Sequence, residues 1–315
     1  MYICSVKIKI QTAMLSDGKI TEIFCLADDF CKFFNNTVKK HSLESNDGKK
    51  HRDKPNKLSN AEVITIMIMF HSCGHRCLKH FYKHYICEHC SHLFPKLLSY
   101  NRFVELEREA LIPMTVFVKE VLLGECTGVS FVDSTPLRVC NNRRIHCHKV
   151  FKGIAMRGKC SMGWFFGFKL HLIINEKGEI LNFTFTPGDV DDRAPLKMEN
   201  FVKVIFGKLV GDKGYISKEL FAELFINDIQ LITKIKSNMK NCLMSVSDKV
   251  YLRKRAVIES VNDELKNIAQ IEHSRHRSVC NFMVNAVSAI AAYCFFPKKP
   301  SIAVETYTDN QLVLF

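Results

Sequence analysis

The spacing of apolar residues divides the chain into two parts. In the first part apolar residues recur at helical intervals, and residues 17 to 45 predict one such helix. A polar loop follows to about Lys57. Ser59-Asn-Ala-Glu62 then has the residues of a capping box, ahead of another apolar run. Helical spacing continues to about Leu123, so this pattern predicts a mostly helical N-terminal region.

At Gly128 the spacing of apolar residues changes to one that is typical of β-strands instead of helices. Residues 129–133 form a short β-prone run that ends at Asp133. Residues 166–174 alternate between apolar and polar, which predicts a half-buried strand. A turn at 175–178 and a second alternating run complete a β-hairpin.

Helices and strands alternate after the hairpin. We expect a helix from about Pro195 to Phe206, a strand at 208–212, a helix that Ser217 caps, a strand at 230–235 and a helix at 255–270. This order predicts an α/β fold with a mixed sheet flanked by helices.

Composition indicates a folded protein with a polyanionic partner. The 315 residues are 47% hydrophobic and carry a net charge of +13. No acid occurs from Ser134 to Asn175, and that stretch includes Arg143, Arg144, Lys149 and Lys152. A second acid-free stretch runs from Ile229 to Ser247. Cationic surface this concentrated favours nucleic acid over a merely solubilising face.

Targeting signals do not change this picture. The opening sixteen residues are too short and too interrupted to span a bilayer. Fourteen cysteines are scattered through apolar sequence without a clear secretory leader, which favours reduced thiols in the cytoplasm. We therefore expect a cytoplasmic protein with no membrane partner.

Three carboxylates are candidate ligands for divalent metals. Asp133 and Asp212 each end an apolar run, where a strand would deliver them to a shared edge. Glu259 lies on the expected helix in a polar stripe with Arg255, Asn262 and Lys266. Such carboxylates can hold metals that act on phosphodiesters. Each also has an ordinary interpretation, as a turn residue or as a surface ion pair.

Two other clusters compete for a metal. Three acids in Asp189-Val-Asp191-Asp192 favour a loop more than a cation site. The Cys/His-rich segment 71–92 includes Cys87-x-x-Cys90, which has zinc-ligand spacing, but it follows helical periodicity. Zinc is the less favoured interpretation there.

The chain resembles the IS982 family of DDE insertion-sequence transposases through six motifs that follow one another along the chain. The resemblance covers about residues 14 to 300, and Arg255, Glu259 and Lys266 have the family's spacing in the last motif. Tyr251 stands one residue too early to match the family's tyrosine. The motifs are Phe131-Val-Asp133-Ser-Thr-Pro-Leu137, Lys149-Val-Phe-Lys-Gly153, Gly163-Trp-Phe-Phe-Gly-Phe-Lys-Leu-His-Leu172, Thr186-Pro-Gly-Asp-Val-Asp-Asp-Arg193, Gly211-Asp-Lys-Gly-Tyr215 and Arg255–Lys266.

The resemblance implies an RNase H-like catalytic fold in which Asp133, Asp212 and Glu259 bind two Mg²⁺ ions, with Mn²⁺ able to substitute. It implies metal-dependent cleavage of phosphodiesters at element ends and transfer of the freed 3′-hydroxyls into target DNA. Arg255 and Lys266 would contact phosphates, and Arg143, Arg144, Lys149 and Lys152 would hold DNA backbone. A homodimer or higher oligomer on bacterial DNA is implied as well.

The expected domain boundaries follow from these patterns. Residues 1–13 are an expected extension upstream of the fold, 14–125 a helical region for DNA recognition or dimerisation, 126–299 the catalytic domain and 300–315 a tail. Two other functions stay open at this point. They are a metal-dependent nuclease of the same fold that does not join ends, and a zinc-containing DNA-binding protein.

Overall fold

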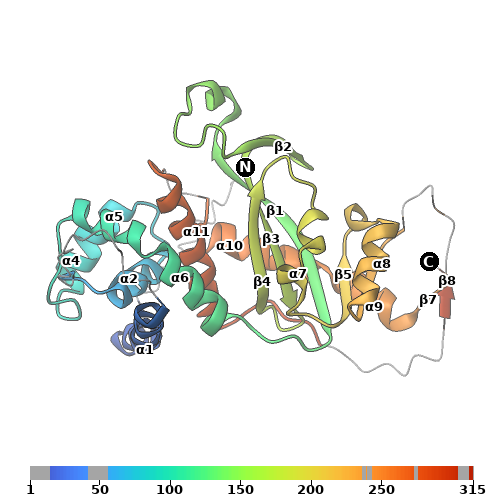
Figure 1. Cartoon of the computed structure of the whole chain (residues 1–315), viewed down its shortest axis with the longest axis horizontal. Coiled ribbons are helices and arrows are strands. Elements are labelled where there is room, and N and C mark those ends of the chain that lie inside the picture. Colours follow the sequence, from blue (N-terminus) through green and yellow to red (C-terminus); the bar gives the residue numbers. More distant parts are fainter. Residues whose placement is uncertain are drawn as a thin grey trace, which may run out of the picture.

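The computed structural model describes residues 15–41, 56–235, 239, 243–272, 276–303 and 312–314. Figure 1 shows the N-terminal helices gathered at one end of the molecule, with the mixed sheet beside them. The expected extension 1–13 and most of the polar loop before Lys57 lie outside the described residues.

The N-terminal region is helical, as its periodicity predicts. Its described residues form α-helices and two π-helical segments. The elements are α1 (Asp17–His41), α2 (Asn60–Ser72), α3 (Leu78–His80), η1 (Phe81–Ile86), α4 (Cys87–His89), α5 (Tyr100–Glu109), α6 (Leu111–Phe117) and η2 (Val118–Leu122).

A capping box starts the most buried of these helices. Ser59 Oγ accepts a hydrogen bond from the Glu62 backbone N–H at 3.2 Å, and Glu62 Oε2 accepts one from the Ser59 N–H at 2.7 Å. Both otherwise unpaired amides are therefore satisfied, which the local sequence predicts. Ten of the thirteen residues of α2 are buried, so its position governs the helical core.

Replacing Ser59 with alanine should lower the free energy of unfolding by about 1 kcal/mol, because one amide at the start of α2 loses its partner. Urea unfolding of the two proteins measures this difference. Ser59→Asn is the control, since asparagine is an equally good cap. Equal loss in both variants would show that the hydroxyl contributes through something other than capping.

The sheet is mixed, as the order of the expected elements predicts. β4 (Ile180–Pro187) and β1 (Val129–Cys140) flank β3 (Gly163–Asn175) in antiparallel pairing, and β5 (Gly207–Gly211) and β6 (Ile229–Thr233) continue the sheet in parallel. β2 (Met156–Cys160) pairs with the first part of β3. A separate pair is formed by β7 (Leu243–Ser245) and β8 (Leu312–Leu314).

The expectation that Asp133 ends its strand is wrong. β1 continues for seven residues beyond Asp133, through Pro136 to Cys140. Its parallel pairing with β5 covers only residues 129–131, whereas its pairing with β3 runs nearly the full length. Proline has no N–H to donate, and it is tolerated here because the side of β1 away from β3 has no partner strand at that point.

Helices cover both faces of the sheet. One face shares a core with the N-terminal helices and with α10 (Ala256–Asn267) and α11 (Val279–Cys294). The other packs against α7 (Glu199–Val202) and α8 (Lys218–Ile226). Because both faces are covered, β3 is buried almost throughout, and the expectation of a half-buried strand is wrong.

The remaining helices of the catalytic half are short, and α11 lies between the N-terminal helices and the sheet. The helix expected at 195–206 is instead a 3-10 turn, η4 (Ala194–Lys197), followed by α7. The others are η3 (Asn142–Cys147), η5 (Lys213–Tyr215) and α9 (Val246–Lys254). In Figure 1 α11 stands between the N-terminal helices and the sheet, and it packs against α2, α5 and α6. The domain boundary near residue 125 stays a prediction.

The described helices include none that is both long and apolar enough to cross a membrane. In the same part of the chain the cysteines are free thiols.

Candidate functional site

Asp133 projects from the middle of β1 toward α10. Phe131 belongs to the core on the α10 side and Val132 to the core on the other side, so alternation turns Asp133 to the α10 side. Its side chain is 23% exposed. The parallel pairing of β1 with β5 ends at Phe131, two residues before Asp133.

Asp212 follows β5 directly, as its sequence predicts. β5 ends at Gly211, and the chain turns into η5 after Asp212. Because β5 runs parallel to β1 as its next neighbour, the two aspartates lie at the same edge of the sheet. Asp212 is exposed there.

Glu259 and Arg255 face Asp133 from α10 and its start. Arg255 stands between α9 and α10, and its Nη2 is 2.6 Å from Glu259 Oε1. Its Nη1 is 4.0 Å from Asp133 Oδ1. The guanidinium therefore lies between the two carboxylates. Glu259 is 59% exposed, so this ion pair alone contributes little to stability.

Asn262 supplies the direct contact between α10 and Asp133. Its Nδ2 donates a hydrogen bond of 3.0 Å to Asp133 Oδ2. Its Oδ1 is buried and has no hydrogen-bond partner among the described residues. The Asn262 side chain thus orients the Asp133 carboxylate and places an unpaired acceptor oxygen beside it. The sequence had placed Asn262 in the polar stripe without indicating this role.

Lys266 lies at the other end of this helix. Its Nζ is 4.0 Å from Glu272 Oε1, and Glu272 Oε1 accepts a hydrogen bond from the Arg138 N–H. α10 packs along β1, with Asn262 against Asp133 and Lys266 on the side of Arg138. Lys266 therefore lies about one helical turn beyond the residue that contacts Asp133.

The three carboxylates share one electrostatic neighbourhood. Burial raises the pKa of Asp133 to about 6, the Arg255 guanidinium opposes that rise, and the charges of Glu259 and Asp212 add to it. Carboxylates that disfavour one another's ionisation would be stabilised by a cation bound among them.

The oxygen atoms of this site suit a hard divalent cation, although the three carboxylates do not point to a common position. Carboxylate and amide oxygens are the ligands such ions prefer, and Asn262 Oδ1 is an orphaned acceptor beside Asp133. Within the described ranges, no three His, Cys, Asp or Glu side chains are grouped closely enough to hold a metal. The same holds for the Cys/His-rich segment 71–92, where His71 instead contacts the Ala269 carbonyl.

The basic residues expected to hold DNA project from the sheet. Arg143 and Arg144 lie on η3, and Lys149 and Lys152 follow it in the excursion between β1 and β2. All four are exposed. Figure 1 shows this excursion rising beyond the end of the sheet, beside β2. Two residues of the second basic stretch, Lys236 and Lys240, lie outside the described residues.

Tyr215 is a site residue that sequence reasoning overlooked. It is buried under the aspartate edge, and its hydroxyl has no hydrogen-bond partner in the described part of the chain. Burial raises the pKa of Tyr215 well above its usual value, and the charges of Asp133 and Asp192 contribute. Its place in Gly211-Asp-Lys-Gly-Tyr215 was a usable signal, because the motif puts it three residues after Asp212.

Comparison with known proteins identifies this half of the molecule. Residues 123–279, about half of the chain, match the family model described as "Transposase DDE domain". No curated protein sequence matches the chain. The matched segment contains β1 to β6 and α10, and hence every carboxylate of the site.

Solved structures of transposases resemble the chain more distantly. The piggyBac transposase synaptic complex with hairpin DNA has 12% identity and a TM-score of 0.47, covering 87% of this chain and 74% of its own. The Mos1 Strand Transfer Complex has 10% identity and a TM-score of 0.24, covering 90% and 98%. Residues 123–279 are thus similar to transposase DDE domains over just under half of the chain, which indicates an enzyme that acts on DNA.

Proposed function

We propose that the protein is a DDE transposase of the IS982 type that cuts DNA at the ends of an insertion sequence and joins the freed ends to target DNA. The observation that supports the proposal is the match of residues 123–279 to the transposase DDE domain, in a segment where Asp133 and Asp212 lie on adjacent parallel strands and Arg255 stands between Asp133 and Glu259. DNA-bound dimers or higher oligomers on bacterial DNA belong to the same proposal.

Asp133, Asp212 and Glu259 would hold the divalent cations, of which Mg²⁺ is the proposed species and two the proposed number. When bound, such ions activate the attacking oxygen and stabilise the leaving oxygen. Asn262 keeps Asp133 oriented through its 3.0 Å hydrogen bond. Arg255, which now pairs with Glu259 at 2.6 Å, would contact a phosphate beside the site.

The reaction has two displacements at phosphorus. In the first, a water oxygen attacks the scissile phosphate, the P–O3′ bond breaks and the element end is left with a 3′-hydroxyl. In the second, that hydroxyl attacks a target phosphodiester, and a target 3′-oxygen leaves with a proton. Lys266, about one helical turn beyond Asn262, would contact the DNA backbone beside the site. Arg143, Arg144, Lys149 and Lys152 would hold the duplex through its phosphates.

The test is a cleavage and strand-transfer assay with DNA fragments taken from the sequences on either side of the gene. With Mg²⁺ or Mn²⁺ we expect nicking at the ends, and joining of precleaved ends to a plasmid target. EDTA should abolish both reactions. Cleavage without joining would favour the nuclease alternative, and absence of both with every divalent metal would overturn the proposal.

A further inference from the structure

A pocket of about 420 Å³ lies beside the carboxylate edge and takes no part in the proposed chemistry. It is lined by the β2–β3 ribbon, by the loop 188–192 and by Gly214, which is two residues from Asp212. Lys169 in its wall pairs with Pro136, three residues along β1 from Asp133, or about 10 Å. The pocket is therefore a few nucleotides at most from a phosphate held at Asp133.

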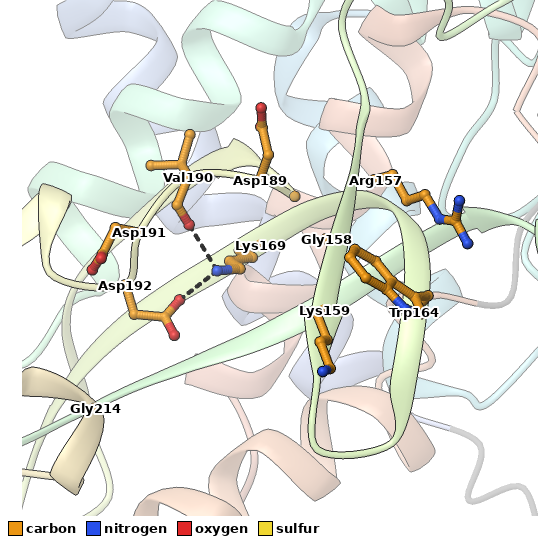
Figure 2. Close-up of a pocket in the computed structure, with 11 residues that line it drawn as sticks. Arg157, Gly158, Lys159, Trp164, Lys169, Asp189, Val190, Asp191, Asp192 and Gly214 are labelled. Carbon is orange, nitrogen blue, oxygen red and sulfur yellow. Dashed lines mark hydrogen bonds and ion pairs between the residues drawn. The ribbon is translucent and has the colours of Figure 1, made fainter.

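The wall formed by β2 and β3 presents an aromatic ring between two cations. Trp164 is 52% exposed, Arg157 lies over its ring at 4.9 Å from the centroid, and the Lys159 ammonium lies at 5.9 Å. Figure 2 shows Trp164 and Arg157 side by side, with Lys159 below them. Neither cation has a carboxylate partner among the described residues.

Of the three acids in the opposite wall, Asp191 and Asp192 are paired with cations, whereas Asp189 is exposed and has no ion-pair partner among the described residues. Lys169 Nζ is 2.9 Å from Asp192 Oδ1 and donates to the Val190 carbonyl at 2.7 Å, which fixes the loop to β3. Asp191 is paired with Arg193. Figure 2 shows Lys169 reaching across to this loop. The unpaired positive charge of the pocket is thus concentrated around Trp164.

The floor between the walls is bare backbone. A Cβ at Gly158 would lie 2.1 Å from the Gly188 carbonyl oxygen, so the ribbon and the loop can approach this closely only as glycines. The pocket therefore has a backbone floor and an aromatic wall.

We propose that this pocket takes one unpaired nucleobase of the DNA substrate, stacked on Trp164, with its phosphates at Arg157 and Lys159. An aromatic face flanked by unpaired cations is the arrangement that binds single-stranded nucleic acid. A duplex hides the faces of its bases, so the ring selects a base that has left the stack. This inference rests on the proposed function for its substrate, but its test needs no catalysis.

Trp164 is the sole tryptophan of the chain, so its fluorescence reports on this pocket alone. The probes are a duplex with a three-nucleotide single-stranded tail and the same duplex with three abasic residues in the tail. Both carry the same phosphates. In EDTA, the base-bearing tail should quench the emission and bind roughly 5- to 150-fold more tightly than the abasic tail.

Variants separate stacking from a structural role, because Trp164 is also the cross-strand partner of Lys159. In fluorescence anisotropy Trp164→Ala should bind both tails equally, and Trp164→Phe should keep part of the preference. Phe225→Ala, which removes an exposed ring on α8, is the control and should keep all of it. If Trp164→Ala does not fold, the fluorescence quenching of the wild-type protein and the tail preference of Trp164→Phe still test the proposal.

Equal affinity of the wild-type protein for the two tails, or unchanged emission, would overturn the proposal. The proposal would also be overturned if Trp164→Phe were less stable but kept the full preference for the base-bearing tail. Trp164 would then only stabilise the pairing of β2 with β3. Loss of strand transfer with normal quenching would instead contradict the proposed function and leave the pocket assignment standing.

Discussion

Replacing Asp212 with alanine should reduce cleavage of element ends on the order of 10³-fold or more, equivalent to about 4 kcal/mol of transition-state stabilisation. The reason is that one of three proposed cation-binding carboxylates is lost while the others stay. Asp212 is exposed beyond the end of β5, so its removal leaves both cores intact. DNA binding, which depends on basic residues elsewhere, should change little.

The measurement is cleavage of labelled ends together with gel-shift binding and a melting curve for each protein. Asp263→Ala is the matched control, because Asp263 is an exposed carboxylate next to Asn262 on α10 and takes no part in the site. It should keep full activity. Cleavage retained by Asp212→Ala would contradict the assignment of the site, and loss in both variants would point to a general effect of charge.

Replacing Glu107 with glutamine should stabilise the protein at neutral and alkaline pH, by roughly 3 kcal/mol at pH 7. Glu107 is buried on α5, and Asn281 at the start of α11 donates to its carboxylate at 3.2 Å. Burial raises the pKa of Glu107 to about 8, with the Asn281 hydrogen bond opposing the rise. Glu107 therefore loses its proton near pH 4.5 in the unfolded chain but keeps it up to about pH 8 in the folded protein.

The pH window follows from the direction of that shift. Between about pH 4.5 and 8 the folded protein keeps a proton that the unfolded chain loses, so stability falls as pH rises and levels off above 8. Glutamine removes this dependence, and the advantage of Glu107→Gln should be small at pH 4.5 and largest above 8. Urea unfolding at several pH values measures it, with the exposed Glu105→Gln on the same helix as control. An advantage of equal size at every pH would refute the explanation.

Local sequence was sufficient wherever the determining contacts are close in the chain. The capping box of α2 joins Ser59 to Glu62, and Ser217 caps α8 through the Leu220 N–H. The hairpin of β3 and β4 follows from alternation around one turn. Asp212 was correctly expected after its strand, since Gly211 ends the apolar run.

The errors occur where distant contacts override local signals. Pro136 and the polar residues around it suggested that β1 stops at Asp133, yet pairing with β3 carries the strand on to Cys140. β2 is a five-residue strand containing Arg157, Gly158 and Lys159, and its composition gives no strand signal without its partner. Helices on both faces of β3 bury positions that alternation assigned to solvent.

The sequence by itself determined the helical N-terminal region, the β3–β4 hairpin, the place of Asp212 after β5 and the positive charge of the chain, because periodicity, caps and composition are properties of neighbouring residues. The tertiary structure alone decided that Asn262 holds Asp133, that Arg255 stands between Asp133 and Glu259, and that Trp164 faces a pocket near Asp212. Those relations join residues far apart in the chain, and only the register of the sheet and the packing of α10 along β1 bring them together.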